Sequence, residues 1–267
     1  MQKRSLRLLA TSVAVLAMAG AGCRARADVV VNVEPDGSGS VTVTATLDAD
    51  AVEQIGDLDS ALRVEDLEAT GWSVDGPTKR GDDTVLAVTK EFAEASRLGP
   101  IMTEVGGAAG PFRDWKLTSS SSFTVSSYEL AGKVNLTGSL DQFSDSEVAA
   151  ALDGFATGRT PDEIAAALKD HPDALQLGVA VDLPGELENA TGLDPTDPDP
   201  NVAAKHYRLG DGIAVDTVID VRSSASDRTS VLWILVGGGL IVAAVALAVA
   251  GRRQATRGRR PRRTPAS

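Results

Sequence analysis

Few residues in this chain are suited to acid–base, nucleophilic or metal chemistry. There are two histidines, His171 and His206, and a single cysteine, Cys23. Imidazole acts as a metal ligand or a general base beside suitably placed partners, and neither histidine stands in a motif such as H-E-x-x-H. The sequence has no G-x-S-x-G nucleophile elbow, and the serines at 119–122 fit a strand or turn better. We therefore expect no enzymatic activity, no resident metal and no cofactor.

Three aspartates alternate with prolines near the end of the body, at Asp194, Asp197 and Asp199. Clustered carboxylate oxygens are ligands that Ca²⁺ prefers, but the spacing does not match an EF-hand loop. The prolines favour a stiff and extended backbone. The pattern predicts a solvated loop over residues 184–202 rather than a calcium site.

The densest group of aromatic and basic side chains lies between residues 112 and 133, in a chain that is only 4% aromatic. An apolar surface with a cationic rim would suit a ligand or lipid that carries a phosphate head group. Aromatic residues at strand spacing also fit the core of the domain, with the charged residues turned to solvent. Both interpretations remain open. The candidate ligand-binding residues are Phe112, Arg113, Trp115, Lys116 and Lys133, with Phe123 and Tyr128 in the same group.

The charges of the chain are unevenly distributed. Its formal net charge is −11, from 26 basic and 37 acidic residues. Basic residues gather before Asp28 and after Gly251, where no Asp or Glu occurs, so the body between these points is strongly acidic. Phosphate contacts need a basic surface, which argues against a nucleic-acid partner. A change of sign at both ends is typical of a membrane-anchored chain.

Residues 1–27 resemble an export signal, with a positive start followed by an apolar stretch. Small residues precede Cys23, as in lipoprotein signals, in which the thiol receives a diacylglycerol. Gly20 stands where such signals usually carry leucine. Two alternatives remain open: ordinary cleavage after Ala27, at the A-x-A pattern of residues 25–27, and an uncleaved anchor.

Residues 231–250 are twenty residues without a charge. At about 1.5 Å per helical residue they would span roughly 30 Å, the thickness of a bilayer's hydrocarbon core. The Arg-rich residues 251–267 follow at once. The positive-inside rule predicts a single C-terminal span in the cell membrane, with a cytoplasmic tail and an extracytoplasmic body over residues 28–228.

Alternating apolar residues in the body predict a hairpin over residues 29–47. Helical spacing predicts helices over 48–63, 64–70 and 92–106, with Asp48 or Asp50 as the first N-cap. Because strands outnumber helices and most strand pairs resemble hairpins, we expect an α+β fold. In it an antiparallel or mixed sheet carries helices packed on one face, and one C-terminal transmembrane helix follows. The other predicted elements are strands at 71–74, 84–90, 116–128, 129–137 and 175–183, two helices within 144–172, and a hairpin over 205–221.

Three segments resemble the LppM-like domain of actinobacterial lipoproteins. They are VNVEPDGSGSVTVTATLD, LRVEDLEATGWSVDGPTK and GGAAGPFRDWKLT. The order of signal, domain, C-terminal span and Arg-rich tail is also similar to that family, and the resemblance covers about residues 28–222. It implies a cell-envelope lipoprotein with a lipid-binding fold and an affinity for phosphoinositide mannolipids. It implies no catalytic residues.

From these observations we expect a non-enzymatic, membrane-anchored envelope protein that binds membrane lipid or envelope glycolipid. The alternative is an interaction or assembly module that meets envelope proteins through its acidic surface. In either case no nucleic acid is expected as a partner.

Overall fold

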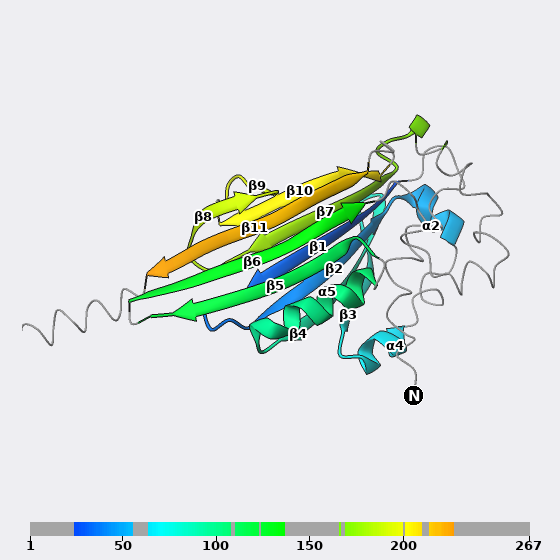
Figure 1. Cartoon of the computed structure of the whole chain (residues 1–267). Helices are drawn as coiled ribbons and strands as arrows, with labels where there is room; N and C mark the ends of the chain where they lie inside the picture. Colours follow the sequence, from blue (N-terminus) through cyan, green and yellow to red (C-terminus); the bar gives the residue numbers. More distant parts are fainter. Residues whose placement is uncertain are drawn as a thin grey trace, which may run out of the picture. The chain divides into compact units, whose positions relative to one another are not determined.

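The computed structural model describes residues 24–55, 64–107, 110–122, 124–136, 166, 169–199, 201–209 and 214–226 (Figure 1). Within these residues the helices are α2 (Ala49–Ile55), α4 (Val64–Ala69) and α5 (Leu98–Gly106), with a 3-10 turn at Ala95–Arg97. The strands are β1 (Ala25–Val33), β2 (Gly39–Leu47), β3 (Ser73–Arg80), β4 (Asp83–Phe92), β5 (Phe112–Ser121), β6 (Val125–Leu136), β7 (Leu175–Asp182), β8 (Glu186–Thr191), β9 (Asp194–Pro195), β10 (Val202–Arg208) and β11 (Val215–Ser226).

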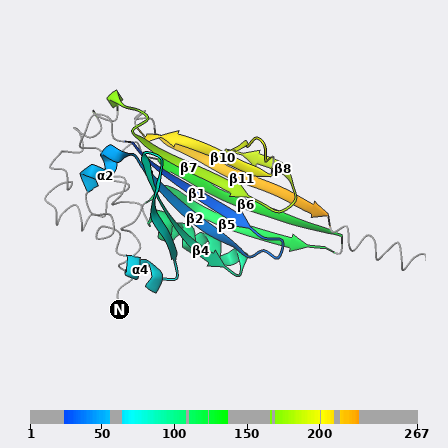
Figure 2. The same ribbon diagram turned by 180° about the vertical axis from the view of Figure 1, so that it is seen from behind.

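The strands form two sheets that share one hydrophobic core. Sheet A has seven strands in the order β3-β4-β2-β1-β7-β10-β9, and sheet B has four in the order β5-β6-β11-β8. Sheet B lies across one face of sheet A (Figure 1), and the view from behind shows the other face of sheet A (Figure 2). The core draws on both sheets, for example on Val31 and Val41 from sheet A and on Leu130 and Ile219 from sheet B.

This arrangement corrects the predicted fold class. The α+β expectation, with helices packed on one face of a single sheet, is wrong, because sheet B occupies the face that helices were expected to cover. Alternating apolar residues show only that one side of a strand is buried, and a second sheet buries that side as well as helices do. The expectation of a mixed sheet holds in detail, since β1 runs antiparallel to β2 and parallel to β7.

Helix α5 is the helix that contributes most to the core. Its buried residues Leu98, Ile101, Met102 and Val105 have the i, i+3, i+4, i+7 spacing of an apolar helix face, and the helix packs against β2. Lys90 of β4 reaches toward it: its ammonium lies 2.5 Å from a Glu104 oxygen and donates to the Thr70 carbonyl at 2.9 Å. The first contact connects α5 to β4, and the second connects β4 to the residue that follows α4.

Local signals explain how the first elements begin and turn. The β1–β2 turn places Gly37 at φ +84°, a conformation that glycine adopts without strain. In the same turn Asp36 accepts hydrogen bonds from the Ser38 N–H and hydroxyl. Asp48 caps α2 by accepting the Ala51 N–H at 2.9 Å, which confirms one of the two predicted N-caps.

Several predicted elements differ from the observed ones. The segment 92–97 is not α-helical, because β4 continues to Phe92 and α5 begins at Leu98. β5 ends at Ser121 and β6 begins at Val125, so the boundary between these strands comes earlier than the predicted one after residue 128. The predicted loop over 184–202 contains β8 and β9, and the predicted hairpin over 205–221 is not one, since β10 lies in sheet A and β11 in sheet B.

Other predictions fall on residues that the structure does not describe. They are the export signal with Cys23, the C-terminal span at 231–250, the Arg-rich tail, and most of the two helices predicted within 144–172, of which residues 166, 169 and 170 are described and helical. Among the described helices, none is long and apolar enough to cross a membrane.

The contact between Gly132 and Trp115 yields a test of the core. A Cβ added at Gly132 would lie 2.8 Å from the Trp115 indole, which is 5% exposed. Overpacking of this kind costs about 1–3 kcal/mol. We therefore expect Gly132→Ala to lower the free energy of unfolding by that amount in chemical denaturation. Ser127→Ala, at an exposed position of the same strand, is the control and should change stability by less than about 0.5 kcal/mol. Equal effects of the two variants would contradict the close indole packing.

Candidate functional site

The structure separates the aromatic from the basic members of the predicted ligand group. Phe112 and Trp115 are buried, pack edge to face with centroids 6.0 Å apart, and belong to the core between the sheets. The Trp115 indole N–H donates to the Lys133 carbonyl at 3.1 Å. Tyr128 is also buried and donates its hydroxyl to the Pro35 carbonyl at 2.5 Å. These three rings are therefore core residues, as the second of the two interpretations expects.

Arg113, Lys116 and Lys133 do not share a cavity with these rings. Lys116 and Lys133 are exposed and Arg113 is half-buried. The Lys133 ammonium lies 3.7 Å from a carboxylate oxygen of Asp114, and both side chains are open to solvent. An exposed pair of this kind contributes at most about 1 kcal/mol to stability, so the two charges remain accessible to other partners. Phe123 lies outside the described residues.

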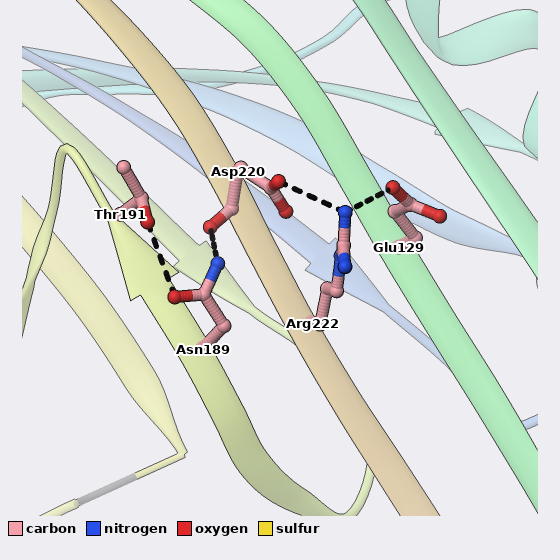
Figure 3. Close-up of polar contacts among 5 residues, drawn as sticks. All are labelled: Glu129, Asn189, Thr191, Asp220 and Arg222. Atoms are coloured by element: carbon pink, nitrogen blue, oxygen red, sulfur yellow. Dashed lines mark hydrogen bonds and ion pairs between the residues drawn. The ribbon is translucent and has the colours of Figure 1, made fainter.

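Elsewhere on sheet B the charges neutralise one another. Figure 3 shows Arg222 of β11 between two carboxylates, with its Nη2 atom 2.9 Å from Glu129 of β6 and 3.0 Å from Asp220. Asn189 of β8 donates to the Asp220 carbonyl at 2.9 Å and accepts from the Thr191 hydroxyl at 3.1 Å. This network connects β6, β8 and β11, and Arg222 contacts a carboxylate on each side.

The outer face of sheet A carries a second charged group, which the sequence did not reveal. Asp28 of β1 lies 2.6 Å from the Arg26 Nε atom and 3.4 Å from the His206 Nε2 atom of β10. Strand β7 runs between these two strands, and its residue at this level is Gly178. A Cβ at residue 178 would overlap the Asp28 carboxylate, so the glycine is what lets Asp28 reach across β7.

This His–Asp pair does not complete a catalytic triad within the described residues. None of the outward residues beside His206 is a nucleophile; they are Gln176, Gly178 and Ala180 on β7 and Ala204 and Arg208 on β10. His171, the other histidine, is exposed just before β7. The described residues contain no group of three or more His, Cys, Asp or Glu that could hold a metal ion, and Asp194, Asp197 and Asp199 are exposed beside β9 and β10.

The charges at the two ends of this face differ in their pairing: the cations at one end pair with Asp28, Asp48 and Asp173, whereas the other end carries carboxylates. We call the end where β1 begins, beside Leu47 of β2, the Arg24 end, and the end where β1 turns into β2 the Glu34 end. Arg24, Arg26, His206 and Arg208 lie at or near the first. Within the described residues, the carboxylates at the second form no ion pair with a cation; they are Glu34, Asp36, Glu91, Asp182 and Asp199.

Two pKa shifts report on the Glu34 end. Burial raises the pKa of Asp182 above its ordinary value, and repulsion from Asp199 and Glu34 raises it further. By contrast, the hydrogen bonds from the Ser38 hydroxyl and N–H lower the pKa of Asp36. Of the two causes that raise the pKa of Asp182, the second indicates that Asp199 and Glu34 lie close enough to repel its carboxylate.

Together, these features define a two-sheet β domain with an electrostatically divided outer face. No protein-family model and no curated protein matches the chain. Among solved structures, the chain is similar to the folded domain of LppM from Mycobacterium tuberculosis, determined by NMR. The sequence identity is 14%, the match covers 77% of this chain and 92% of that one, and the TM-score is 0.40. LppM is the protein after which the family resembled by the sequence motifs is named.

The opposite pKa shifts of Asp182 and Asp36 lead to a paired prediction. The raised pKa of Asp182 means that ionisation of this carboxyl destabilises the fold. The protonated carboxyl therefore contributes stability in acid, and this contribution is lost as pH rises through the folded pKa. Asp182→Asn should therefore raise the melting temperature at neutral pH, with the difference vanishing in acid. Asp36→Asn should do the reverse at neutral pH, because the lowered pKa means that the ionised form is stabilising. Thermal melts across pH would contradict this if both variants shifted the melting temperature in the same direction.

Proposed function

We propose that the protein is a non-enzymatic lipoprotein of the cell envelope, anchored through acylated Cys23. Its two-sheet domain would lie outside the cytoplasmic membrane and bind lipid or glycolipid. The observation that carries this proposal is the position of β1, a strand at the centre of sheet A that begins only two residues after Cys23.

The position of β1 discriminates between the two cleavage sites in the signal. Cleavage after Ala27 would remove Ala25, Arg26 and Ala27, each of which pairs with β2 on one side and with β7 on the other. Ala25 is 3% exposed, and its N–H donates to the Ala174 carbonyl at 2.8 Å. Each lost backbone hydrogen bond costs about 1 kcal/mol. Processing before Cys23 keeps this part of the strand intact and is therefore favoured.

Three cations of sheet B support lipid binding. The exposed Lys116 and Lys133 and the half-buried Arg113 lie on one hairpin, and such cations would bind a phosphate head group. A phosphate-bearing envelope lipid fits these cations better than a neutral ligand does. The core aromatic residues have no part in this contact, because Phe112 and Trp115 are buried.

A second candidate function rests on the Glu34 end. Glu34 and Asp199 repel the Asp182 carboxylate there, and an envelope protein with a basic surface would relieve that repulsion. In this alternative the domain is an assembly module and the lipid serves only as its anchor.

The anchor is tested by the mass of the N-terminal peptide. The full chain is produced in a host that processes lipoproteins, purified in detergent and digested. We expect an acylated peptide that starts at Cys23. The variant Cys23→Ala should abolish both the acylation and the cleavage of the signal before residue 23. An unmodified peptide starting at Asp28 would overturn the proposal, since it would show that ordinary signal cleavage occurs.

The ligand is tested by native mass spectrometry of the same preparation, followed by extraction with organic solvent. We expect a bound anionic lipid that is lost on extraction. The variant Arg113→Ala/Lys116→Ala/Lys133→Ala should hold less of it, because charge-assisted contacts to phosphate are removed. A domain without bound lipid that retains one stoichiometric protein partner would favour the assembly module instead.

A further inference from the structure

The chain continues from the domain toward two candidate anchors at opposite ends of β1. β1 begins two residues after Cys23, at the Arg24 end. β11 finishes at the Glu34 end, where the Ser223 hydroxyl donates at 2.9 Å to the carbonyl of Pro184, two residues after β7. The charge-free residues 231–250 begin five residues after β11 ends. An acylated Cys23 and an inserted apolar segment would therefore hold the domain by both ends.

Neither connection is long enough for the domain to stand upright. Successive Cα atoms are at most about 3.8 Å apart, so β1 begins within roughly 8 Å of Cys23. The five steps from Ser226 to Val231 span at most about 18 Å of extended chain. Strands perpendicular to the bilayer would lift one end by the length of β1, roughly 30 Å. With at most about 18 Å of rise over roughly 30 Å of strand, the strands must lie within about 40° of the membrane plane.

The shorter connection belongs to sheet A, which decides the side that meets the membrane. β1 is a strand of sheet A and β11 is a strand of sheet B. Stacked sheets lie about 10 Å apart, so a domain resting on sheet B would raise β1 by more than the roughly 8 Å of chain that follows Cys23. A domain resting on sheet A raises β11 instead, and the longer connection covers that distance. The chain lengths therefore favour contact through the outer face of sheet A.

The middle of this face carries small side chains without charge. Figure 2 views sheet A from this side. One row across it, from β4 to β10, consists of Thr89, Thr42, Val30, Ala180 and Ala204. All five are half-buried, and the two threonine hydroxyls lie 2.9 Å apart, within hydrogen-bonding distance of each other. This row can enter the head-group layer without desolvating a charge.

The charged groups of the face lie on either side of this row. Toward the Arg24 end, Asp28 lies between Arg26 and His206. Toward the Glu34 end, the carboxylates are held by the longer connection, so a modest inclination keeps them out of the head-group layer. On the outer face of sheet B, by contrast, the ion pair of Arg222 with Glu129 joins the two central strands (Figure 3). Resting on sheet B would therefore desolvate charges in the middle of the contact.

We propose that the outer face of sheet A is the surface through which the domain rests on the lipid bilayer, with its strands along the membrane and an anchor at each end. The inference rests on the proposed function, because acylated Cys23 is one anchor; the apolar residues 231–250 are the other. The two connections, rather than the charge of the head groups, set the orientation. Lys116 and Lys133 of sheet B then face away from the bilayer, where an individual envelope lipid would reach them.

A single spin label can identify the face that meets the membrane. The chain has one cysteine, which acylation consumes, so an introduced cysteine is the only free thiol. The label is placed at Thr44→Cys on the outer face of sheet A, or at Val218→Cys, which is 54% exposed on sheet B. The acylated full chain is reconstituted in phosphatidylcholine vesicles that carry a nickel-chelating lipid. We expect strong relaxation by nickel at residue 44 and little at residue 218, because both sheets separate residue 218 from the bilayer.

Two further labels test whether both ends are held. Thr46→Cys and Ser40→Cys lie toward opposite ends of β2 on the same face, and both should be relaxed by nickel. Ten Gly/Ser residues inserted between Asp227 and Arg228 add up to about 36 Å of chain. We expect this insertion to abolish most of the relaxation at residue 40 and to leave that at residue 46 unchanged. The same insertion in the exposed β3–β4 turn, between Gly81 and Asp82, is the matched control and should change neither.

The outcomes separate this inference from the proposed function. Equal or stronger relaxation at residue 218 than at residue 44, relaxation at only one of residues 46 and 40, or a pattern that appears only when phosphatidylglycerol is added would overturn the membrane contact. So would an insertion after Asp227 that changes nothing. In each of these cases the acylated peptide would still support the anchor at Cys23. A chain without lipid on Cys23 would overturn the proposed function and this inference together.

Discussion

Strand β1 is paired on both sides, and the rest of the domain is arranged around that pairing. A short turn supplies its antiparallel neighbour β2, whereas its parallel neighbour β7 comes from much later in the chain. A parallel pair needs a long crossover, and the chain between β2 and β7 includes β3 and β4 of sheet A and β5 and β6 of sheet B. The register of β1 also sorts its side chains. Val29, Val31 and Val33 face the core while Arg26 and Asp28 face outward, and a slip of one residue would exchange them.

The length of β1 explains why the charges at the two ends of the outer face do not affect one another. β1 has nine residues, and at about 3.3 Å per residue it is roughly 30 Å long. This is about three times the distance over which salt screens exposed charges. The cations near Arg24 therefore cannot relieve the repulsion from Asp199 and Glu34 that, after burial, raises the pKa of Asp182. Only a local partner or protonation can relieve it.

The sequence predicted the strands with clear alternation but not how they assemble. β1, β2 and β7 were found because their apolar residues alternate along the sequence, and β4 was found as a run of strand-forming residues after a turn. The Asp48 cap was found because it precedes an apolar helical pattern. β8 was missed because ELENAT has no buried residue to alternate. The separation of Phe112 and Trp115 from Lys116 was one of the two interpretations that the sequence left open. The pairing of Asp28 with His206 was beyond local patterns, because it depends on parallel pairing between distant segments and on a glycine in the strand between them.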